Sequence, residues 1–497
     1  MRTPAVPSPP VIVPVRNRSS PHARTLARLV ALCLPLAGGA CQDSDPVAPH
    51  RATSITNGAV ALQAGTPIVL RGTVITPTGV MKRGYVGIAN GRILSVSDKQ
   101  PDIPGATFVN TEGIILPGFV DVHNHVIWNV LPRWTPSRTF TNQPEWNTDA
   151  EFTEFRQPID ELATSHVCDM NAWGELRALV GGTTAIMATR PRPCIHGLVR
   201  NLDFNSGFYG TTELDRERIF NVSPDDFPPP SDPVGRATFA AVAGFFIANP
   251  FYEALVMHVA EGTDAVAQEQ FTFLQSQGLL NQKGVLVHGV SLGASDFQTL
   301  AATGTALVWS PRSNLELYGT TANIAAALDA GVEIALAPDW ALTGSSNMLD
   351  ELKVAARWNR DQLGGRLTNR QLVDMATSSA AHAVGVHDEV GAIVPGLRAD
   401  LLILRGDASD ALGAVISAEA ADVQLVVVGG VPLYGARGLM APFWAQGDLE
   451  TILMPGGPKT LASPAAGLTV SDVAARLTGA LLGAGTTLAP LVETVAR

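Results

Sequence analysis

A repeated alternation of strand-like and helix-like segments most constrains the fold of this chain. Between about residues 117 and 385, short apolar runs such as VLVHGV, TALVWSP and EIALAPD recur at regular intervals, separated by stretches of helical character. This pattern is typical of βα units, which build parallel sheets and barrels. We therefore predict an α/β fold in which residues 117–385 form a (β/α)8 TIM barrel.

The segments on either side of the predicted barrel have a different texture. Residues 61–116 contain short β-rich runs punctuated by Gly, Asn and Pro, and a related texture returns over residues 386–440. The simplest interpretation is a small β-sandwich domain built from both ends of the barrel. Residues 441–497 are rich in Gly, Pro and Ala, and we expect a C-terminal tail with one helical stretch.

Two features inside the barrel region are specific enough to predict. Thr368 followed by Gln371 forms a capping box, which predicts the start of a helix there. Residues 126–165 form a long insertion after the first strand and carry three tryptophans: Trp128, Trp134 and Trp146. Insertions at this face of a barrel often form a lid or a substrate wall, and a packing flap with buried tryptophans is the alternative.

The N-terminal residues 1–41 resemble an export signal. Four arginines between residues 16 and 28 precede an apolar run over 29–40, which is too short to span a bilayer. The segment LAGGAC resembles the cleavage box of bacterial lipoproteins, in which Cys41 becomes lipidated; an ordinary cleaved signal is the alternative. We expect an exported protein, either periplasmic or anchored to the membrane through Cys41, with a linker over residues 42–60.

Export affects the interpretation of the remaining cysteines. Outside the signal the chain has Cys168 and Cys194, which can pair in an oxidising compartment or remain as two buried thiols.

The formal net charge of −11 argues against nucleic acid as a partner, because nucleic-acid binders usually present a basic face. We expect a small-molecule substrate, and the sequence leaves open a homo-oligomer.

Histidine and acidic residues follow the apolar runs at the positions where strands should end. His123 and His125 lie two residues apart after the first predicted strand, so both side chains can point to the same side. His258, His288 and Asp339 end later strands. The carboxyl ends of barrel strands meet at one face, where such barrels carry their chemistry. Imidazole and carboxylate ligands suit zinc.

Several motifs resemble the amidohydrolase superfamily, and within it the branch of cytosine deaminase and triazine hydrolase. They occur in the order PGFVDVHNH, MHVAE, LVHG, SPRSNLELYG, LAPDW and VGAIVPGLRADLLIL. The resemblance implies a barrel with a small β-sandwich and a divalent metal ion held by His123, His125, His258 and Asp339. It further implies that His288 orients a metal-bound water and that Glu261 moves protons to and from the substrate.

The distribution of lysines limits the number of metal ions. Two-metal members of this superfamily bridge their ions with a carboxylated lysine or sometimes a glutamate, and this chain has no lysine between Lys99 and Lys283. Glu213 is a possible substitute, with a surface residue as the simpler interpretation. We therefore predict one divalent ion, zinc with iron as the alternative.

The predicted reaction is hydrolysis of a carbon–nitrogen bond by metal-activated water, most specifically deamination of a nitrogen heterocycle. Catalytic roles fall to Glu261, His288 and Asp339. The alternatives are ring opening of a cyclic amide, as in imidazolonepropionase-like relatives, and a metal-free binding or scaffold protein on the same fold. Other candidate contacts with a substrate are Trp309, Trp340 and Arg312, each with a structural role as the alternative.

Overall fold

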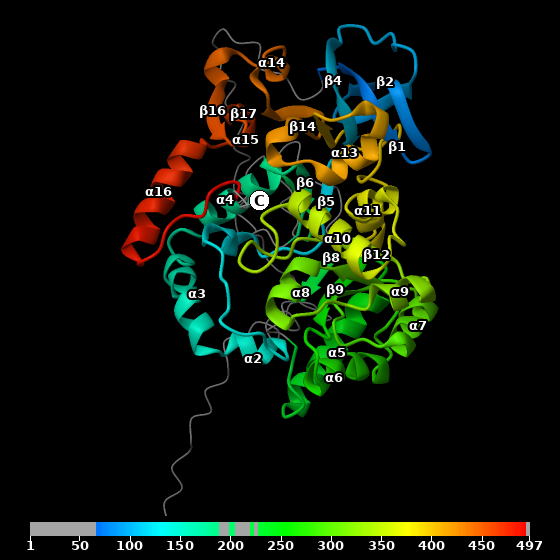
Figure 1. The fold of residues 1–497 in the computed structure, drawn as a ribbon, viewed down its shortest axis with the longest axis vertical. Helices are drawn as coiled ribbons and strands as arrows, with labels where there is room; N and C mark the ends of the chain where they lie inside the picture. Colours follow the sequence, from blue (N-terminus) through cyan, green and yellow to red (C-terminus); the bar gives the residue numbers. More distant parts are fainter. Residues whose placement is uncertain (1–65, 188–197, 204–218, 223–226, 494–497) are drawn as a thin grey trace, which may run out of the picture.

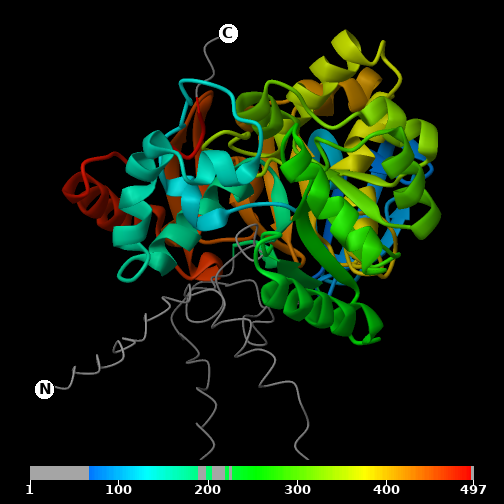
Figure 2. The same ribbon diagram turned by 90° about the horizontal axis from the view of Figure 1, so that it is seen from below.

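A computed structural model describes residues 66–187, 198–203, 219–222 and 227–493 of the chain. Figure 1 shows a large sheet, coloured blue and orange, beside an α/β region coloured green and yellow. Figure 2, seen from below, shows the green and yellow region in front of the blue strands, with the segments coloured cyan and red at one flank. Because blue and orange strands share one sheet, the described segments before and after the central region meet on one side of it.

The large sheet contains strands from both ends of the chain, in the order β16-β17-β15-β14-β13-β4-β1-β2-β3. These strands are β1 (Ile68–Thr76), β2 (Gly79–Ala89), β3 (Arg92–Ser97), β4 (Thr107–Pro117), β13 (Leu401–Leu404), β14 (Val423–Val428), β15 (Val431–Gly435), β16 (Leu449–Met454) and β17 (Gly457–Ala462). The antiparallel pairing of β4 with β13 joins the two halves. The two-ended β domain that the sequence suggested is therefore present.

Two details of this domain differ from the prediction. Its nine strands are hydrogen-bonded as one continuous sheet, whereas a sandwich was expected. The sheet also continues beyond residue 440, because β17 pairs with β15 and β16 pairs with β17. The tail therefore contributes two strands, and Leu449, Ile452 and Met454 of β16 are buried.

The central region contains a five-stranded and a three-stranded parallel sheet. The strands are β5 (Phe119–Asp121), β6 (Thr183–Ile186), β7 (Arg200–Asn201), β8 (Ile219–Val222), β9 (Ala254–Val259), β10 (Gly284–His288), β11 (Ala306–Trp309) and β12 (Ile334–Leu336). A parallel bridge between Asn124 and Asp339 brings the ends of β5 and β12 together. The result is an α/β fold of the barrel type, built from buried apolar strands as parallel sheets require.

Helices alternate with these strands in the predicted way. They are α5 (Pro233–Ala248), α6 (Ala265–Ser276), α7 (Ala294–Thr303), α8 (Pro311–Tyr318), α9 (Ile324–Ala330), α10 (Met348–Gln362), α11 (Asn369–Met375) and α12 (Ser378–Ala383). The capping box predicted at Thr368 is confirmed, since Thr368 and Gln371 bond each other's backbone at the start of α11. Among the described residues, no helix is both long enough and apolar enough to cross a membrane.

The insertion after β5 folds into η1 (Val126–Val130), α2 (Gln143–Asn147) and α3 (Ala150–Leu162), followed by α4 (Val167–Val180). Helix α16 (Val470–Gly483) lies along this region at the left of Figure 1. The chain after α16 bonds to it directly: the Ala489 N–H donates to the Val130 carbonyl, and Trp173 Nε1 donates to the Ala489 carbonyl. The tail therefore packs behind the insertion.

A buried ion pair ties the two parts of the molecule together. Arg200 on β7 donates from Nε and Nη2 to the two carboxylate oxygens of Asp400, each at 2.7 Å, and both side chains are almost fully buried. Asp400 also accepts from the Gly429 N–H in the large sheet. The two parallel hydrogen bonds offset the free-energy cost of removing both charges from water.

Several sequence predictions fall outside the described residues. These are the export signal, Cys41, the linker, Glu213 and Cys194. Cys168 is disulfide-bonded.

Candidate active site

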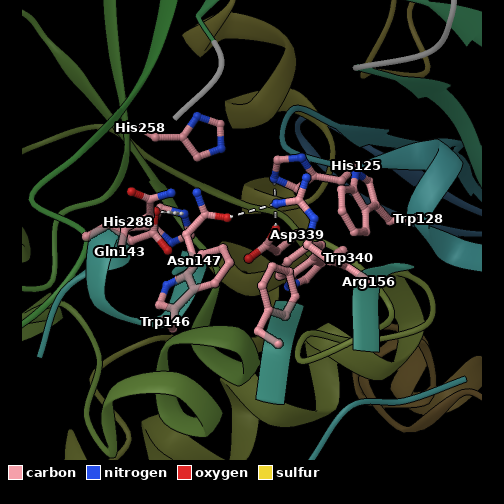
Figure 3. A pocket seen from close by; sticks show the side chains of 12 residues that line it. His125, Trp128, Gln143, Trp146, Asn147, Arg156, His258, His288, Asp339 and Trp340 are labelled. Carbon is pink, nitrogen blue, oxygen red and sulfur yellow. Dashed lines mark hydrogen bonds and ion pairs between the residues drawn. The ribbon is translucent and has the colours of Figure 1, made fainter. Parts of the chain in front are cut away.

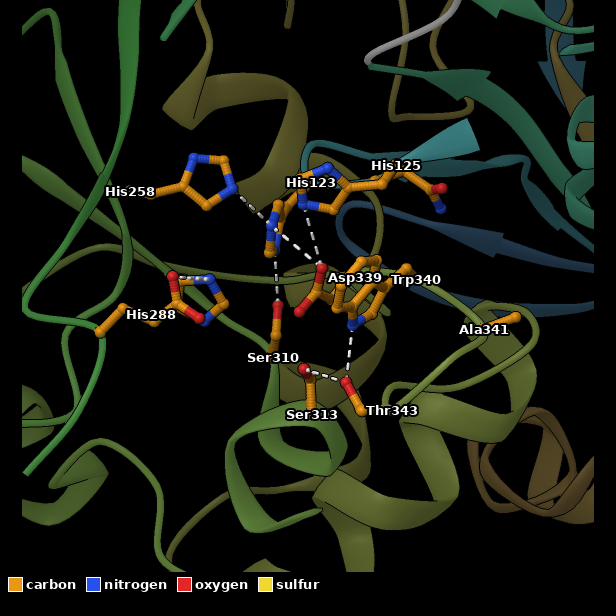
Figure 4. A network of polar contacts seen from close by, with 12 residues as sticks. His123, His125, His258, His288, Ser310, Ser313, Asp339, Trp340, Ala341 and Thr343 are labelled. Atoms are coloured by element: carbon orange, nitrogen blue, oxygen red, sulfur yellow. Dashed lines mark hydrogen bonds and ion pairs between the residues drawn. The ribbon is translucent and has the colours of Figure 1, made fainter. Parts of the chain in front are cut away.

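The strand ends bring the predicted metal ligands together at one face of the central region (Figure 4). His123 follows β5, His258 lies in β9, His288 ends β10, and Asp339 follows β12. Two sets of side-chain atoms each lie within 4.8 Å of one another: His123, His125 and His258, and His123, His288 and Asp339. The sequence predicted this convergence because parallel strands share the edge where they end.

The distances within this cluster suit a shared cation. His123 Nε2 lies 3.0 Å from His258 Nε2, and the Asp339 carboxylate oxygen Oδ1 lies 3.4 Å from the Nε2 atoms of both His123 and His125. Imidazole nitrogen and carboxylate oxygen are zinc ligands, and a divalent ion would satisfy lone pairs that point at one another here. The donor set therefore fits a divalent metal.

Hydrogen bonds on the far side of the rings hold two of these imidazoles in place. His258 Nδ1 lies 3.2 Å from the carbonyl of Val222, at the end of β8. Because a carbonyl only accepts, Nδ1 carries the proton and Nε2 presents its lone pair to the cluster. His123 Nδ1 lies 2.9 Å from the Ser310 hydroxyl. Metal-binding histidines are usually oriented by such partners.

Burial also sets the charge of these side chains. It lowers the pKa of His258 to about 4 and moves the pKa of His123 well below its usual value, with the neighbouring histidines adding to the effect. Both rings are therefore neutral at neutral pH, which is the form that coordinates metals. Burial raises the pKa of Asp339, and a bound cation would counteract this by favouring the charged carboxylate.

A second group of side chains lies beside the cluster and is built around Glu261. Tyr318 donates from its hydroxyl to Glu261 Oε1 at 2.7 Å, and Trp146 Nε1 donates to the Tyr318 oxygen at 2.7 Å. The other carboxylate oxygen lies 3.6 Å from His288 Nε2. Asn314 Oδ1 holds the other nitrogen of His288 at 2.9 Å. The buried Glu261 side chain is therefore held in place by Tyr318 and lies next to His288.

Tyr318 and Asn314 were not predicted as site residues. Both lie in α8, within the segment SPRSNLELYG, whose role the sequence did not reveal. The polar residues of this segment were the available signal, because buried polar side chains need partners. Which partners they find depends on how α8 packs over the ends of β9 and β10.

The backbone is strained at three positions in the site. Ala260, His288 and Asp339 have φ values of +57°, +74° and +68°. This left-handed conformation is unfavourable for residues with a side chain, and such strain concentrates at functional sites. Here it turns the chain sharply after β9, β10 and β12.

The cluster forms the inner end of a pocket with about 560 Å³ of empty space, part of it open to solvent (Figure 3). Its inner wall contains His125, His258, His288, Glu261 and Asp339. Its outer wall is mostly aromatic and comes largely from the insertion. The outer residues are Trp128, Gln143, Trp146, Asn147, Phe152, Arg156 and Trp340.

The structure shows which of the tryptophans line the pocket and which pack in the core. Trp128 and Trp146 line the pocket, whereas Trp134 is buried among aromatic neighbours and serves as packing. Trp340 also lines the pocket. Trp309 is fully buried and donates to the Thr321 hydroxyl, so its role is structural.

The arginine that lines this pocket is a different one from the arginine that the sequence suggested. Arg312 is not among the described lining residues, and its backbone N–H donates to Glu351. Arg156 lines the pocket instead, although no motif in the sequence marks it as a site residue. It lies on α3, and no local pattern distinguishes it from the other arginines of the insertion.

The α/β fold of the barrel type and the buried histidine–carboxylate cluster together define a class of protein with a site suited to a divalent metal. Residues 253–433 match the model of the amidohydrolase family. The chain is 24% identical over 403 residues to the 5-methylthioadenosine/S-adenosylhomocysteine deaminase of Caldicellulosiruptor saccharolyticus, covering 73% of this chain and 91% of that protein. A relative of the same name from Pelotomaculum thermopropionicum is also 24% identical, with 75% and 92% covered.

Solved structures share the fold. Guanine deaminase from E. coli aligns with a TM-score of 0.58 at 19% identity, over 74% of this chain and 99% of that one. Atrazine chlorohydrolase from Arthrobacter aurescens, complexed with zinc, aligns with a TM-score of 0.56 at 19% identity, over 74% and 95%. With the family match, these comparisons confirm the predicted resemblance. The chain is similar to the amidohydrolase superfamily in sequence and fold, and it is an enzyme acting on carbon–nitrogen bonds.

Proposed function

We propose that this enzyme deaminates a nitrogen heterocycle by metal-dependent hydrolysis. The observation that carries the proposal is the position of Glu261 and His288 beside the cluster of His123, His125, His258 and Asp339, at the base of an aromatic-walled pocket. A proton carrier and a metal-binding cluster thus face the same space, where a flat ring can enter. A closed eight-stranded barrel is the architecture we propose around it.

The metal is proposed to be a single zinc ion held by His123, His125, His258 and Asp339, with iron as the alternative. Three imidazoles and one carboxylate are a donor set that zinc accepts, and the lack of lysine between Lys99 and Lys283 excludes a lysine-bridged pair. When bound, such an ion supplies positive charge and Lewis acidity to a water molecule.

The residues of the chain would handle the protons and aim the water. Asp339 and His288 lie where they would accept the proton of the attacking water, with the ring of His288 held by Asn314. Glu261 would pass a proton to the ring nitrogen or to the leaving amine. The Tyr318 hydroxyl donates a hydrogen bond to one carboxylate oxygen of Glu261 and so fixes the orientation of the carboxyl group.

The names of the relatives favour deamination over ring opening. The deaminases from Caldicellulosiruptor saccharolyticus and Pelotomaculum thermopropionicum are named for adenine-containing compounds, and this chain spans most of their length. An adenine-like ring fits a pocket walled by Trp128, Trp146 and Trp340, because bases stack on aromatic side chains. Ring opening of a cyclic amide remains the second candidate, because it uses a similar single-metal site.

Ammonia release separates the two candidates. The zinc-loaded protein would be incubated with 5-methylthioadenosine, S-adenosylhomocysteine, guanine, cytosine and a panel of cyclic amides. We expect ammonia from at least one amino-substituted heterocycle. Consumption of a cyclic amide without ammonia would favour ring opening, and a pure protein that takes up no zinc would favour a binding or scaffold protein.

We also propose that the enzyme is exported, on the basis of the N-terminal sequence, and that Cys41 carries a lipid. Mass spectrometry of the protein from a bacterial host tests this. An acyl mass on an N-terminal Cys41 is expected, whereas a cleaved chain without that mass would leave a free periplasmic enzyme.

A further inference from the structure

The outer wall of the pocket carries one arginine among its described lining residues, Arg156 on α3. Its guanidinium carbon lies 5.6 Å from the centre of the Trp128 ring and 5.9 Å from that of Phe152. Aromatic faces attract a guanidinium and restrict its orientation. A positive charge is thus held at the pocket surface by rings that also line the pocket.

The contacts of Arg156 within the described part of the chain leave its charge largely unneutralised. Its ion-pair partner, Asp160, lies 3.3 Å away and is 58% exposed, so solvent screens the pair and makes it weak. A second contact joins Nη1 to Asn147 Oδ1 at 3.5 Å, the long limit of a hydrogen bond. An incoming oxyanion would compete well with both contacts.

Aromatic contacts connect Arg156 to the metal-binding cluster. The ring of His125 lies 5.3 Å from the ring of Trp340, and the ring of Trp340 lies 5.6 Å from the ring of Trp128. The guanidinium of Arg156 packs against this last ring. Figure 3 shows these four side chains on the same side of the pocket. A flat ring that reacts at the cluster and rests on these tryptophans would direct its substituent towards Arg156.

The two carboxylates that line the pocket do not serve as partners of Arg156. Asp339 faces the histidines and Glu261 is bonded to Tyr318 at the inner end. The pocket therefore separates its charges, with carboxylates inside and a cation outside. A substrate complementary to this arrangement has an electron-poor ring at one end and an anionic group at the other.

We propose that Arg156 determines specificity by binding a carboxylate on the substrate, which would then be a nitrogen heterocycle with an acidic substituent. This rests on the proposed function and specifies its substrate class. A carboxylate fits better than a phosphate monoester, because the planar guanidinium matches a carboxylate in two-pronged geometry and one arginine would leave part of a phosphate's charge unpaired.

The test compares ligands that differ in charge alone. Zinc-loaded full-length protein would be titrated calorimetrically with 9-(carboxymethyl)adenine, its neutral carboxamide and 9-(phosphonomethyl)adenine, with the same acid–amide pairs of guanine and cytosine as further arms. We expect the carboxylate to bind roughly ten- to hundredfold more tightly than the amide, the factor for a hydrogen bond to a charged group. Turnover, where present, should show the preference in KM rather than in kcat.

In Arg156→Gln the carboxylate and the amide should bind with about equal affinity. Arg156→Lys should retain part of the preference for the carboxylate, because lysine keeps the charge without the planar fork. The matched control is Arg360→Gln, which removes one charge from an exposed arginine on α10 that pairs with Asp361. It should keep the full preference. Melting temperatures would identify a variant that fails to fold, in which case Arg156→Lys carries the test.

The outcomes separate this inference from the proposed function. Equal binding of acid and amide in every pair, or a preference that survives Arg156→Gln, would overturn the inference even if ammonia is released. An Arg156-dependent preference without ammonia release would support the inference and contradict deamination. Tighter binding of the phosphonate than of the carboxylate would overturn the choice of carboxylate.

Discussion

The inner and outer walls of the pocket come from different kinds of structure. The inner wall consists of residues at the ends of parallel strands, such as His258 and His288, whose positions the sheet fixes. The outer wall consists mainly of an inserted segment, including Trp128 and Arg156, which packs on the barrel-type core from outside. The comparison suggests that the inner wall determines the reaction and the outer wall determines the substrate.

The largest expected effect tests the inner wall. Asp339→Asn removes the charge that faces His123 and His125. We expect zinc content to fall well below one ion per chain and turnover to fall by roughly a thousandfold or more, beyond the 10- to 100-fold that loss of an outer partner costs. Elemental analysis measures the metal, with Asp361→Asn at an exposed site as the control. Full zinc content in Asp339→Asn would remove it from the ligand set.

Glu261→Gln should separate chemistry from metal binding. The amide keeps the shape of the side chain but cannot carry the proton, so kcat should fall by roughly 10²- to 10⁴-fold with zinc content unchanged. Steady-state kinetics and metal analysis check both parts, and Glu154→Gln on the exposed face of α3 is the matched control. Near-normal turnover in Glu261→Gln would assign proton transfer to another group.

Tyr318 links the two walls, because it bonds to Glu261 on one side and to Trp146 on the other. Tyr318→Phe removes the hydrogen bond to the carboxylate, and we expect a loss of about tenfold in kcat. As a positioning effect it should leave KM and zinc content unchanged while kcat falls. A loss of folded protein or of zinc in place of this selective fall in kcat would make Tyr318 merely structural. Tyr85→Phe, in the large sheet, is the control.

Trp128→Ala should act on the outer wall alone. Stacking of a base on an aromatic ring is worth about 1–3 kcal/mol, so KM should rise by roughly tenfold or more while kcat changes by less than about twofold. Trp128→Phe should lose less, because it retains a ring. A matching fall in kcat would contradict the division of roles between the walls.

The smallest effect concerns α4, which supports the insertion from behind. Burial raises the pKa of Glu175 from 4.5 to about 8, so the folded protein holds a proton there that the unfolded chain has lost. The free energy of unfolding should therefore fall as pH rises through this range, by up to about 1.4 kcal/mol per pH unit. Glu175→Gln should remove that slope and leave turnover at neutral pH unchanged. Denaturant titration at several pH values measures it, and an unaltered slope would contradict the buried neutral carboxyl.

The inner wall was largely predictable from sequence. His123 and His125 are two residues apart at the end of an apolar run, and Asp339 ends another, so strand periodicity alone placed them at one edge. The capping box at Thr368 was equally local. The boundary at residue 440 was not predictable in this way, because the addition of β16 and β17 depends on pairing with β15.

The sequence by itself determined the α/β class and the residues that end the strands, because both depend on short-range periodicity in one segment at a time. Only the tertiary structure decided which side chains meet across segments. Tyr318 reaches Glu261, Asn314 reaches His288, and Arg156 reaches the pocket through Trp128. These contacts depend on how helices pack over the strand ends, and no repeat in the sequence encodes that packing.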